Sequence, residues 1–500
     1  MKKVCLNIIL IFGLGLSGLA QNKYWVYFTS KTWPENSISD QNEAALRDVP
    51  VHALFLDSLA ANGIQPVIQS KWLNAISAYL DQDDMAFLST LSFVDRVSPT
   101  IHTKKTTHAI EVVSHPTEAN FITVLKQING DAIIDFGLNG EGVTIGIIDG
   151  GFLGANESEA LSDIFYENQV KLFRDFTGQN YYAFGGDKLY KDDHGTKVWQ
   201  YIGGYERNND RYRGLSTHSA FYLAKTDRGD REFRGEEDFW IAAIEWMDSL
   251  GIKLINSSVG YSTGFDNPDE DYLPSDADGK TSAISQAAQI AADEKNILIV
   301  VSSGNDGNKG HQVVSMPGDA QGVLTVGAST AKTFKRMNYS SIGSTFTSYP
   351  KPDIVCYSLG GTSYSAPTIT GLAACIMQFN PRLNNLEIIN IIKKSSHLYP
   401  YANNYVGYGV PDARKVLAIL QNPAVETWQA VEVKATKQVI TLPADGMTGT
   451  VLYHKASDIT VIEEVEIKSE NDQFIITNDT GAIRSTIAIG RKVYEIFWPK

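Results

Sequence analysis

The sequence predicts an α/β protein built on a doubly wound parallel sheet, with a small α+β unit before it and an all-β segment after it. Between residues 120 and 420, short unbroken apolar runs alternate with helical patterns, which is typical of a parallel sheet covered on both faces. After residue 421, alternation of Thr, Val and Ile replaces the helical patterns. The 500 residues, 43% of them hydrophobic, exclude a mainly disordered chain.

The first twenty residues have the organisation of a secretory signal. Lys2 and Lys3 precede an apolar run over 4–16, and small residues lead to Ala20, so we expect cleavage before Gln21. The apolar run is shorter than the roughly 20 residues that a membrane-spanning helix needs. The mature chain is therefore predicted to be secreted, periplasmic or held at the cell surface, with no membrane-spanning segment.

Residues 22–100 predict a compact unit with the element order β-α-β-β-α-β. The expected strands lie at 23–30, within 64–80 (two strands) and at 93–98, and the expected helices at 51–62 and 81–91. This order is that of a ferredoxin-like α+β fold. Residues 99–120, which include Lys104, Lys105 and Pro116, are polar and unpatterned and indicate a linker or processing site.

The middle of the chain holds the predicted sheet. Expected strands lie at 143–148, 220–224, 252–256, 297–301 and 323–326, with helices at 236–250, 282–294 and 362–379. In sheets of this kind, ligands bind at the carboxyl ends of the strands. The residues that follow each strand are therefore where we expect the chemistry.

Three residues are well placed for nucleophilic catalysis. Asp149 ends the first central strand, His194 opens an amphipathic helical run, and Ser363 lies in a glycine-rich turn before Pro367. A serine hydroxyl needs a positioned imidazole to take its proton, and the imidazole needs a carboxylate to fix its tautomer. Each residue alone is an ordinary cap or turn residue, but together they predict an Asp-His-Ser triad.

Asp149-Gly-Gly, His194-Gly-Thr and Gly-Thr-Ser363-x-Ser-x-Pro, in that order, resemble the three motifs of the subtilisin-like serine peptidases, or subtilases. The resemblance covers about residues 120–420 and implies a subtilisin-like domain there. It implies an inhibitor-like propeptide over 21–115 and leaves 421–500 as a C-terminal β domain. The implied protein is a serine endopeptidase that forms an acyl-enzyme with protein or peptide substrates and needs no cofactor for its chemistry. It is expected to be made as a self-processed precursor that its own propeptide inhibits.

The resemblance also implies further site residues. Asn305 matches the oxyanion donor of the family, although alone it would be interpreted as a turn residue. Two segments match the walls of the pocket for the residue before the scissile bond, and their small residues favour an apolar side chain. These residues are Ser257, Ser258, Val259 and Gly260 on one wall, and Ser302, Ser303 and Gly304 on the other.

The chain departs from the family pattern at two places. Trp199 stands where a small residue is usual, so we expect different packing behind the histidine helix. The segment between Asp353 and Gly361 is shorter than usual, which leaves open the geometry of the loop on the leaving-group side.

Two other classes of protein were weighed. Residues 260–264 match the G-x-S-x-G elbow of an esterase around Ser262, with Asp319 or Asp353 and His397 downstream, but a proline-containing acidic loop follows where a helix is required. A non-catalytic export or adhesion module would keep the fold with a blocked cleft, and the complete set of motifs argues against it.

Metal and nucleic-acid binding have little support. The acidic loop does not match an EF-hand, so we interpret it as solvated and leave open a structural calcium site of another kind. Its acids are Asp266, Asp269, Glu270, Asp271, Asp276 and Asp278. The histidines lack metalloprotease spacing. A net charge of −14 argues against a general nucleic-acid partner.

Signal cleavage would remove Cys5 and leave two cysteines, Cys356 and Cys375. An oxidising compartment permits a bridge between them. We favour two buried free thiols instead, because Cys375 falls on a helical pattern roughly 18 Å beyond Ser363 along its axis.

Overall fold

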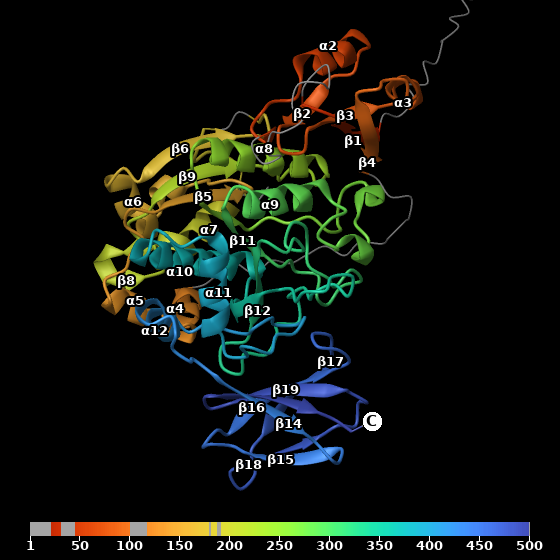
Figure 1. Ribbon diagram of the computed structural model, residues 1–500. Helices are drawn as coiled ribbons and strands as arrows, with labels where there is room; N and C mark the ends of the chain where they lie inside the picture. The colour runs from red at the N-terminus through yellow and green to blue at the C-terminus, as the bar shows by residue number, and fades with distance from the viewer. Residues whose placement is uncertain (1–21, 32–45, 101–117, 180–181, 188–191, 500) are drawn as a thin grey trace, which may run out of the picture.

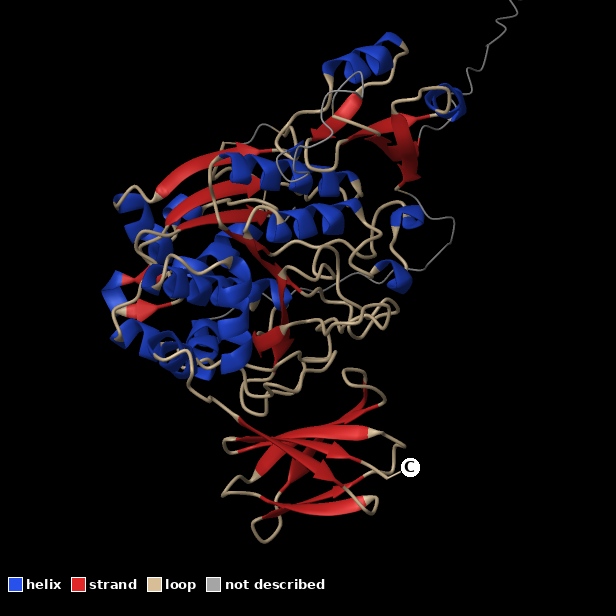
Figure 2. Ribbon diagram, viewed as in Figure 1, coloured by secondary structure: helices blue, strands red, loops and turns tan. Residues whose placement is uncertain are grey.

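The computed structural model describes residues 22–31, 46–100, 118–179, 182–187 and 192–499 (Figure 1). The predicted signal segment and most of the predicted linker, including Lys104, Lys105 and Pro116, lie outside these residues. The described chain forms an N-terminal α+β unit, a large α/β domain and a C-terminal β unit, which follow one another along the molecule (Figures 1 and 2). No helix in this part of the chain is long and apolar enough to span a membrane.

The N-terminal unit confirms the predicted ferredoxin-like order. Its elements are β1 (Asn22–Phe28), α2 (Ala53–Ala61), β2 (Pro66–Ser70), β3 (Ala75–Leu80), α3 (Gln82–Leu88) and β4 (Val94–Pro99). The strands form one antiparallel sheet in the order β2-β3-β1-β4. Helix α3 begins at a capping box in which Asp81 accepts the Asp84 backbone N–H. Val26, Phe55 and Leu59 lie in the core between the helices and the sheet.

The α/β domain is built on a seven-stranded sheet in the order β13-β12-β11-β10-β5-β9-β6, and every neighbouring pair is parallel. Its strands are β5 (Thr144–Asp149), β6 (Val170–Asp175), β9 (Ala220–Lys225), β10 (Leu254–Ser257), β11 (Leu298–Ser302), β12 (Leu324–Ser329) and β13 (Ile354–Tyr357). Strands β6 and β13 were not predicted. They lie at the two edges of the sheet, where β6 carries charged residues and β13 has only four residues.

Helices cover both faces of this sheet, as predicted (Figure 2). They are α4 (Glu118–Gln127), α5 (Asp131–Asp135), α6 (Ser162–Tyr166), α7 (His194–Gly203), α8 (Gly235–Ser249), α9 (Ala283–Asp293), α10 (Ala366–Phe379), α11 (Asn385–Ser395) and α12 (Ala413–Gln421). Strand β5 shows why two layers form, because alternate side chains point to opposite faces. Ile147 packs with α7 and α10, whereas Ile148 packs with α8 and α9.

The C-terminal unit confirms the predicted small β domain. Strands β14 (Gln429–Lys434), β16 (Gly449–Lys455), β17 (Val461–Lys468), β19 (Arg484–Ile489) and β20 (Lys492–Phe497) form one sheet, and β15 (Val439–Pro443) pairs with β18 (Gln473–Thr477). The two sheets share one core that includes Leu452, Phe474 and Ile487. In the α/β domain, a short antiparallel hairpin of β7 (Tyr205–Glu206) and β8 (Arg211–Tyr212) follows α7.

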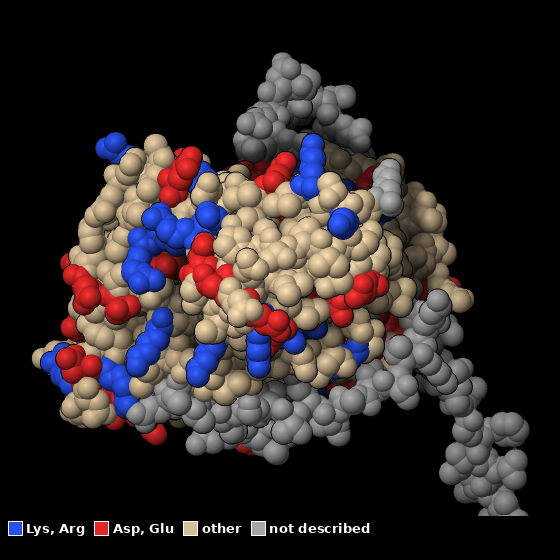
Figure 3. Space-filling model, turned by 90° about the horizontal axis from the view of Figure 1, so that it is seen from below, with Lys and Arg blue, Asp and Glu red and all other residues tan. Residues whose placement is uncertain are grey.

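Two further expectations concern cysteine and charge. Cys356 and Cys375 are both buried and free, which confirms the prediction of unpaired thiols. On the face shown in Figure 3, Lys and Arg side chains are interspersed with Asp and Glu side chains.

Candidate active site

The structure brings Asp149 and His194 together at the carboxyl end of the sheet. Asp149 is the last residue of β5 and is fully buried, and His194 is the first residue of α7. The His194 Nδ1 atom lies 2.7 Å from Asp149 Oδ1, which also accepts the Gly150 backbone N–H at 2.8 Å. A Cβ atom on Gly195 would lie 2.5 Å from the carbonyl oxygen of Gly151. Glycine at 195 therefore allows the helix to start this close to the aspartate turn.

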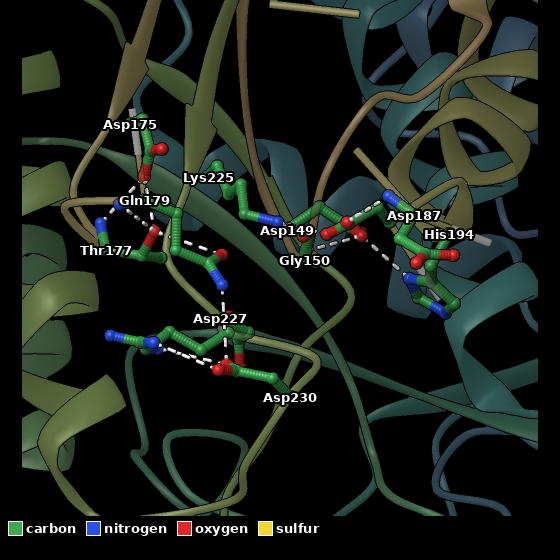
Figure 4. Close-up of polar contacts among 12 residues, drawn as sticks. Asp149, Gly150, Asp175, Thr177, Gln179, Asp187, His194, Lys225, Asp227 and Asp230 are labelled. Atoms are coloured by element: carbon green, nitrogen blue, oxygen red, sulfur yellow. Dashed lines mark hydrogen bonds and ion pairs between the residues drawn. The ribbon is translucent and has the colours of Figure 1, made fainter. Parts of the chain in front are cut away.

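A buried ion pair that the sequence analysis missed supports this arrangement. Lys225, at the end of β9, lies opposite Asp149 in the parallel register and donates to the Gly150 carbonyl oxygen at 2.8 Å. The same ammonium group pairs with Asp192, two residues before His194, and both side chains are 2% exposed. Figure 4 shows Lys225 extending toward the turn at Asp149 and Gly150. The pair thus connects this turn to the start of α7.

Ser363 lies in a single 3-10 turn, Thr362–Tyr364, immediately before α10. Its hydroxyl donates to the Ser258 carbonyl oxygen at 3.2 Å, and the Ser258 hydroxyl donates to the Ser363 carbonyl oxygen at 3.0 Å. The neighbouring Tyr364 ring lies 5.7 Å from the His194 imidazole. The serine turn is therefore held between the histidine helix and the segment that follows β10.

Asn305 is held in a defined orientation beside Ser363. Its side-chain oxygen accepts the Thr362 backbone N–H at 2.9 Å and the Thr362 hydroxyl at 3.2 Å. A Cβ added to Gly361 would lie 3.3 Å from Asn305 Nδ2 and 3.5 Å from Oδ1, so the whole amide group lies against the Gly361 turn. Gly361 has a φ of 118°, which only glycine adopts readily.

The two predicted pocket walls lie side by side. Ser257 ends β10 and pairs with Val301 of the adjacent strand β11, so 257–260 and 302–304 leave the same end of the sheet. Ser257 accepts the Trp240 indole N–H at 2.9 Å. A Cβ on Gly260 would lie 3.0 Å from Ser315 Cβ, and Ser315 donates its backbone N–H to the Ser303 carbonyl oxygen. Apart from Val259, the two segments consist of serine and glycine.

The alternative nucleophile is not assembled into an esterase site. Ser262 is 8% exposed and donates to Asp306 Oδ2 at 2.6 Å. Asp353 is paired with Lys351 and Lys393. Two 3-10 turns, Pro268–Glu270 and Pro274–Asp276, follow the serine.

The proposed partner histidine, His397, is also committed elsewhere, because its Nδ1 accepts the Val410 backbone N–H at 2.8 Å. Burial lowers the pKa of His397 to about 4.

The acids of the calcium candidate loop stabilise its turns. Asp271 accepts the backbone N–H groups of Gly264 and Phe265, and Asp276 accepts that of Leu273. Among the described residues, no three His, Cys, Asp or Glu side chains converge as metal ligands. Calcium dependence stays a prediction, which thermal unfolding with and without a chelator would test.

Trp199 shows how packing behind the histidine helix accommodates a large side chain. The residue is fully buried, and its ring lies 5.2 Å from Phe221 and 5.6 Å from Phe165. Phe152, just after the aspartate turn, meets it edge-on at 6.4 Å. An aromatic cluster therefore fills this layer beneath the site.

Comparison with known proteins identifies the class of protein. The model of the subtilase family matches residues 140–409, and that of the peptidase S8 propeptide domain of Bacteroidota matches residues 23–113. The chain therefore belongs to the subtilase family and is a serine endopeptidase with an S8 propeptide.

Individual relatives agree with this assignment. Subtilisin DY of Bacillus licheniformis is 24% identical over 283 residues, covering 54% of this chain and 90% of that protein. Subtilisin BL of Lederbergia lenta is 27% identical over 230 residues, covering 44% and 76%.

Solved structures share the fold at low identity. Fervidolysin from Fervidobacterium pennivorans, described as a keratinolytic enzyme related to subtilisin, has a TM-score of 0.52 and 18% identity, covering 94% of this chain and 71% of that one. The epidermin leader peptide processing protease of Staphylococcus aureus has a TM-score of 0.55 and 16% identity, covering 81% and 100%. At these identities the likeness concerns the fold alone.

Proposed function

We propose that this protein is a secreted endopeptidase that cleaves protein substrates with Ser363, His194 and Asp149 and is made as a self-processed precursor. The observation that carries the proposal is the 2.7 Å contact between His194 Nδ1 and Asp149 Oδ1, formed beside the anchored Ser363 turn. The contact leaves Nε2, the far nitrogen of the ring, as the atom that would accept the serine proton.

The chemical steps follow from this geometry. A rotation about the Ser363 Cα–Cβ bond turns the hydroxyl from the Ser258 carbonyl oxygen toward the imidazole, which takes its proton as Oγ attacks the scissile carbonyl. His194 then gives the proton to the leaving amine, and water repeats the sequence on the acyl-enzyme. Asp149 holds the ring and stabilises the imidazolium.

Asn305 and the Ser363 backbone N–H are the proposed oxyanion donors. The Asn305 side-chain oxygen is already used by Thr362, so its NH2 group is the part available to a developing oxyanion. Donors held in place before the reaction stabilise the tetrahedral intermediate without reorganisation. Residues 257–260 would pair with the substrate backbone as an added strand.

The N-terminal unit is the proposed inhibitor. It packs on α8 through buried polar contacts, including Lys23 with Asp238 at 2.6 Å and Ser70 with Glu245 at 2.6 Å. Thr100 is the last described residue before the linker. Its carbonyl oxygen accepts a hydrogen bond from the guanidinium group of Arg234, at the N-terminus of α8. Removal of the unit would follow a cut within 99–120.

Replacement of the nucleophile tests the proposal. Ser363→Ala should leave the precursor uncut and abolish casein hydrolysis, while Ser262→Ala, the matched control, should process normally. A fluorophosphonate probe should label Ser363 in the wild type. Normal self-cleavage of Ser363→Ala, or an adduct on Ser262, would overturn the assignment. N-terminal sequencing of the exported protein checks secretion and the expected cut before Gln21.

A further inference from the structure

The loop between β9 and α8 places a carboxylate beside the proposed triad. Asp227 comes two residues after Lys225 in this loop, part of which is drawn in Figure 4. A Cβ on Gly150 would lie 3.9 Å from the Cβ of Asp227. The Asp227 Oδ1 atom also accepts the Tyr261 hydroxyl at 3.2 Å, and Tyr261 directly follows the proposed substrate strand. Asp227 thus lies between the aspartate turn and that strand.

A second acid behind Asp227 has an unused oxygen. Glu236, in the first turn of α8, is 1% exposed, and its Oε1 accepts the Arg228 backbone N–H at 2.6 Å. Its Oε2 is buried and has no hydrogen-bond partner among the described residues. A buried carboxylate oxygen without a donor is costly to keep charged.

The cations near these acids pair with other residues. Lys225 pairs with Asp192, Arg228 with Asp230, and Arg234 with Glu237. The described chain therefore supplies no ion-pair partner to Asp227 or Glu236. Burial, with Glu232 and Asp149 nearby, raises the pKa of Asp227 to about 7. Burial and the charge of Asp227 raise the pKa of Glu236 to about 10. A substrate cation beside Asp227 would lower the pKa values of both carboxyl groups.

The position of this pair relative to the cleft indicates which substrate residue reaches it. In an extended peptide, successive side chains point to opposite sides. If the residue before the scissile bond, P1, enters the pocket between 257–260 and 302–304, the preceding residue, P2, points back toward His194 and Asp149. Asp227 borders this side of the cleft through Gly150 and Tyr261.

We propose that Asp227, backed by Glu236, forms a subsite that selects lysine or arginine at P2. This inference rests on the proposed peptidase function. The linker in which self-processing is expected carries adjacent lysines at 104 and 105, so a cut after Thr106 would place Lys105 at P2 and a small uncharged side chain at P1. The chain itself therefore offers one substrate of the required chemistry.

Paired substrates test the subsite. Two fluorogenic peptides that differ only in lysine or leucine at P2 are compared with the self-processed enzyme. The wild type should favour lysine in kcat/KM by about 10- to 100-fold, the usual effect of a hydrogen bond to a charged group. Asp227→Asn should remove most of this preference, measured as the ratio of the kcat/KM values for the lysine and the leucine peptide. Asp230→Asn, in the same loop but paired with Arg228, is the matched control and should keep the preference.

A second variant and a binding measurement separate the possible failures. Glu236→Gln should reduce the preference less than Asp227→Asn, and thermal unfolding shows whether either variant is destabilised. The Ser363→Ala chain, cut by trypsin at Lys104 or Lys105 and freed of its propeptide, should bind the lysine peptide more tightly in calorimetry only while Asp227 is present. Hydrolysis without a lysine preference would overturn the subsite and leave the peptidase proposal standing. Asp227-dependent binding of the lysine peptide without any hydrolysis would support the subsite and overturn the peptidase proposal.

Discussion

Helix α8 carries buried carboxylates on two sides, and those on one side are fully hydrogen-bonded whereas those on the other side are not. On the side of the N-terminal unit, Asp238 is fully buried and meets the Lys23 ammonium and the Ser77 hydroxyl, so both of its oxygens are bonded. On the cleft side, Glu236 is two residues away and equally buried, but one of its oxygens has no donor among the described residues. The two sides differ in where the hydrogen-bond donors and cations for these carboxylates come from.

The interface with the N-terminal unit is complete within the precursor. Glu245, two turns further along α8, accepts the Ser70 hydroxyl and the backbone N–H groups of Lys71 and Trp72. All these donors belong to the unit that the proposed processing removes, and water can replace them afterwards. On the cleft side, Asp227 accepts the Thr226 and Tyr261 hydroxyls, and Glu236 Oε2 has no donor, but the described chain gives neither acid an ion-pair partner. This is the arrangement expected where a substrate supplies a cation. The bonded carboxylates of α8 therefore hold the N-terminal unit, the proposed inhibitor, whereas the acids on the cleft side have no cation partner among the described residues.

The largest expected effect lies in the cleft. Asn305→Ala should lower kcat about 10²- to 10³-fold, because one preorganised oxyanion donor is lost, while KM changes little. The affinity for the separate propeptide should be unchanged. Steady-state kinetics on a peptide substrate and inhibition by added propeptide measure both quantities. A variant with wild-type kcat would show that this amide does not act on the transition state.

A smaller effect is expected at the interface. Asp238→Ala leaves Lys23 buried without its partner, and breaking such a pair costs about 3 kcal/mol or more, equivalent to at least roughly 100-fold in the inhibition constant of the propeptide. Hydrolysis by the free enzyme should not change. Asp248→Asn, on the same helix but paired with Lys253 of its own domain, is the control.

Combining Asp238→Ala with Lys23→Met in the added propeptide should recover part of the lost inhibition, because no unpaired ammonium remains to be buried. Equal inhibition of the wild type and Asp238→Ala by the unmodified propeptide would show that the pair does not contribute to docking.

The smallest expected effect is a pH dependence of propeptide binding. Burial under the N-terminal unit raises the pKa of Glu245, whereas the carboxyl of the free enzyme is solvated. The complex therefore binds more protons than its separated parts, and affinity should fall as pH rises from the ordinary carboxyl range through the raised pKa. We expect the inhibition constant to increase a few-fold between pH 5 and pH 8 and the slope to flatten in Glu245→Gln. An increase of affinity with pH would reverse the assigned sign.

Much of the fold and of the candidate site could be predicted from local patterns. Uninterrupted apolar runs marked the central strands, and glycine-flanked motifs marked Asp149, His194 and Ser363. The helices α11 and α12 were missed, although Asn384 and Asp412 cap their N-termini and their apolar residues follow a helical period. The edge strands β6 and β13 were also missed, because they are short or carry charged residues and depend on neighbours far along the chain. The same limit concealed the pair of Lys225 with Asp192, which are separated by 33 positions and meet only when β9 lies beside β5.

The sequence by itself determined the types of the central strands and of helices such as α8, α9 and α10, the order of the three motifs and the places where glycine is needed, because these depend on periodicity and backbone sterics. Only the tertiary structure decided which acid meets which cation. Asp238 pairs with Lys23, which lies 215 positions earlier in the chain. Asp227 and Glu236 have no cationic partner among the described residues. Charge pairing depends on distance in space, and that distance is set by the packing of the sheet, α8 and the N-terminal unit.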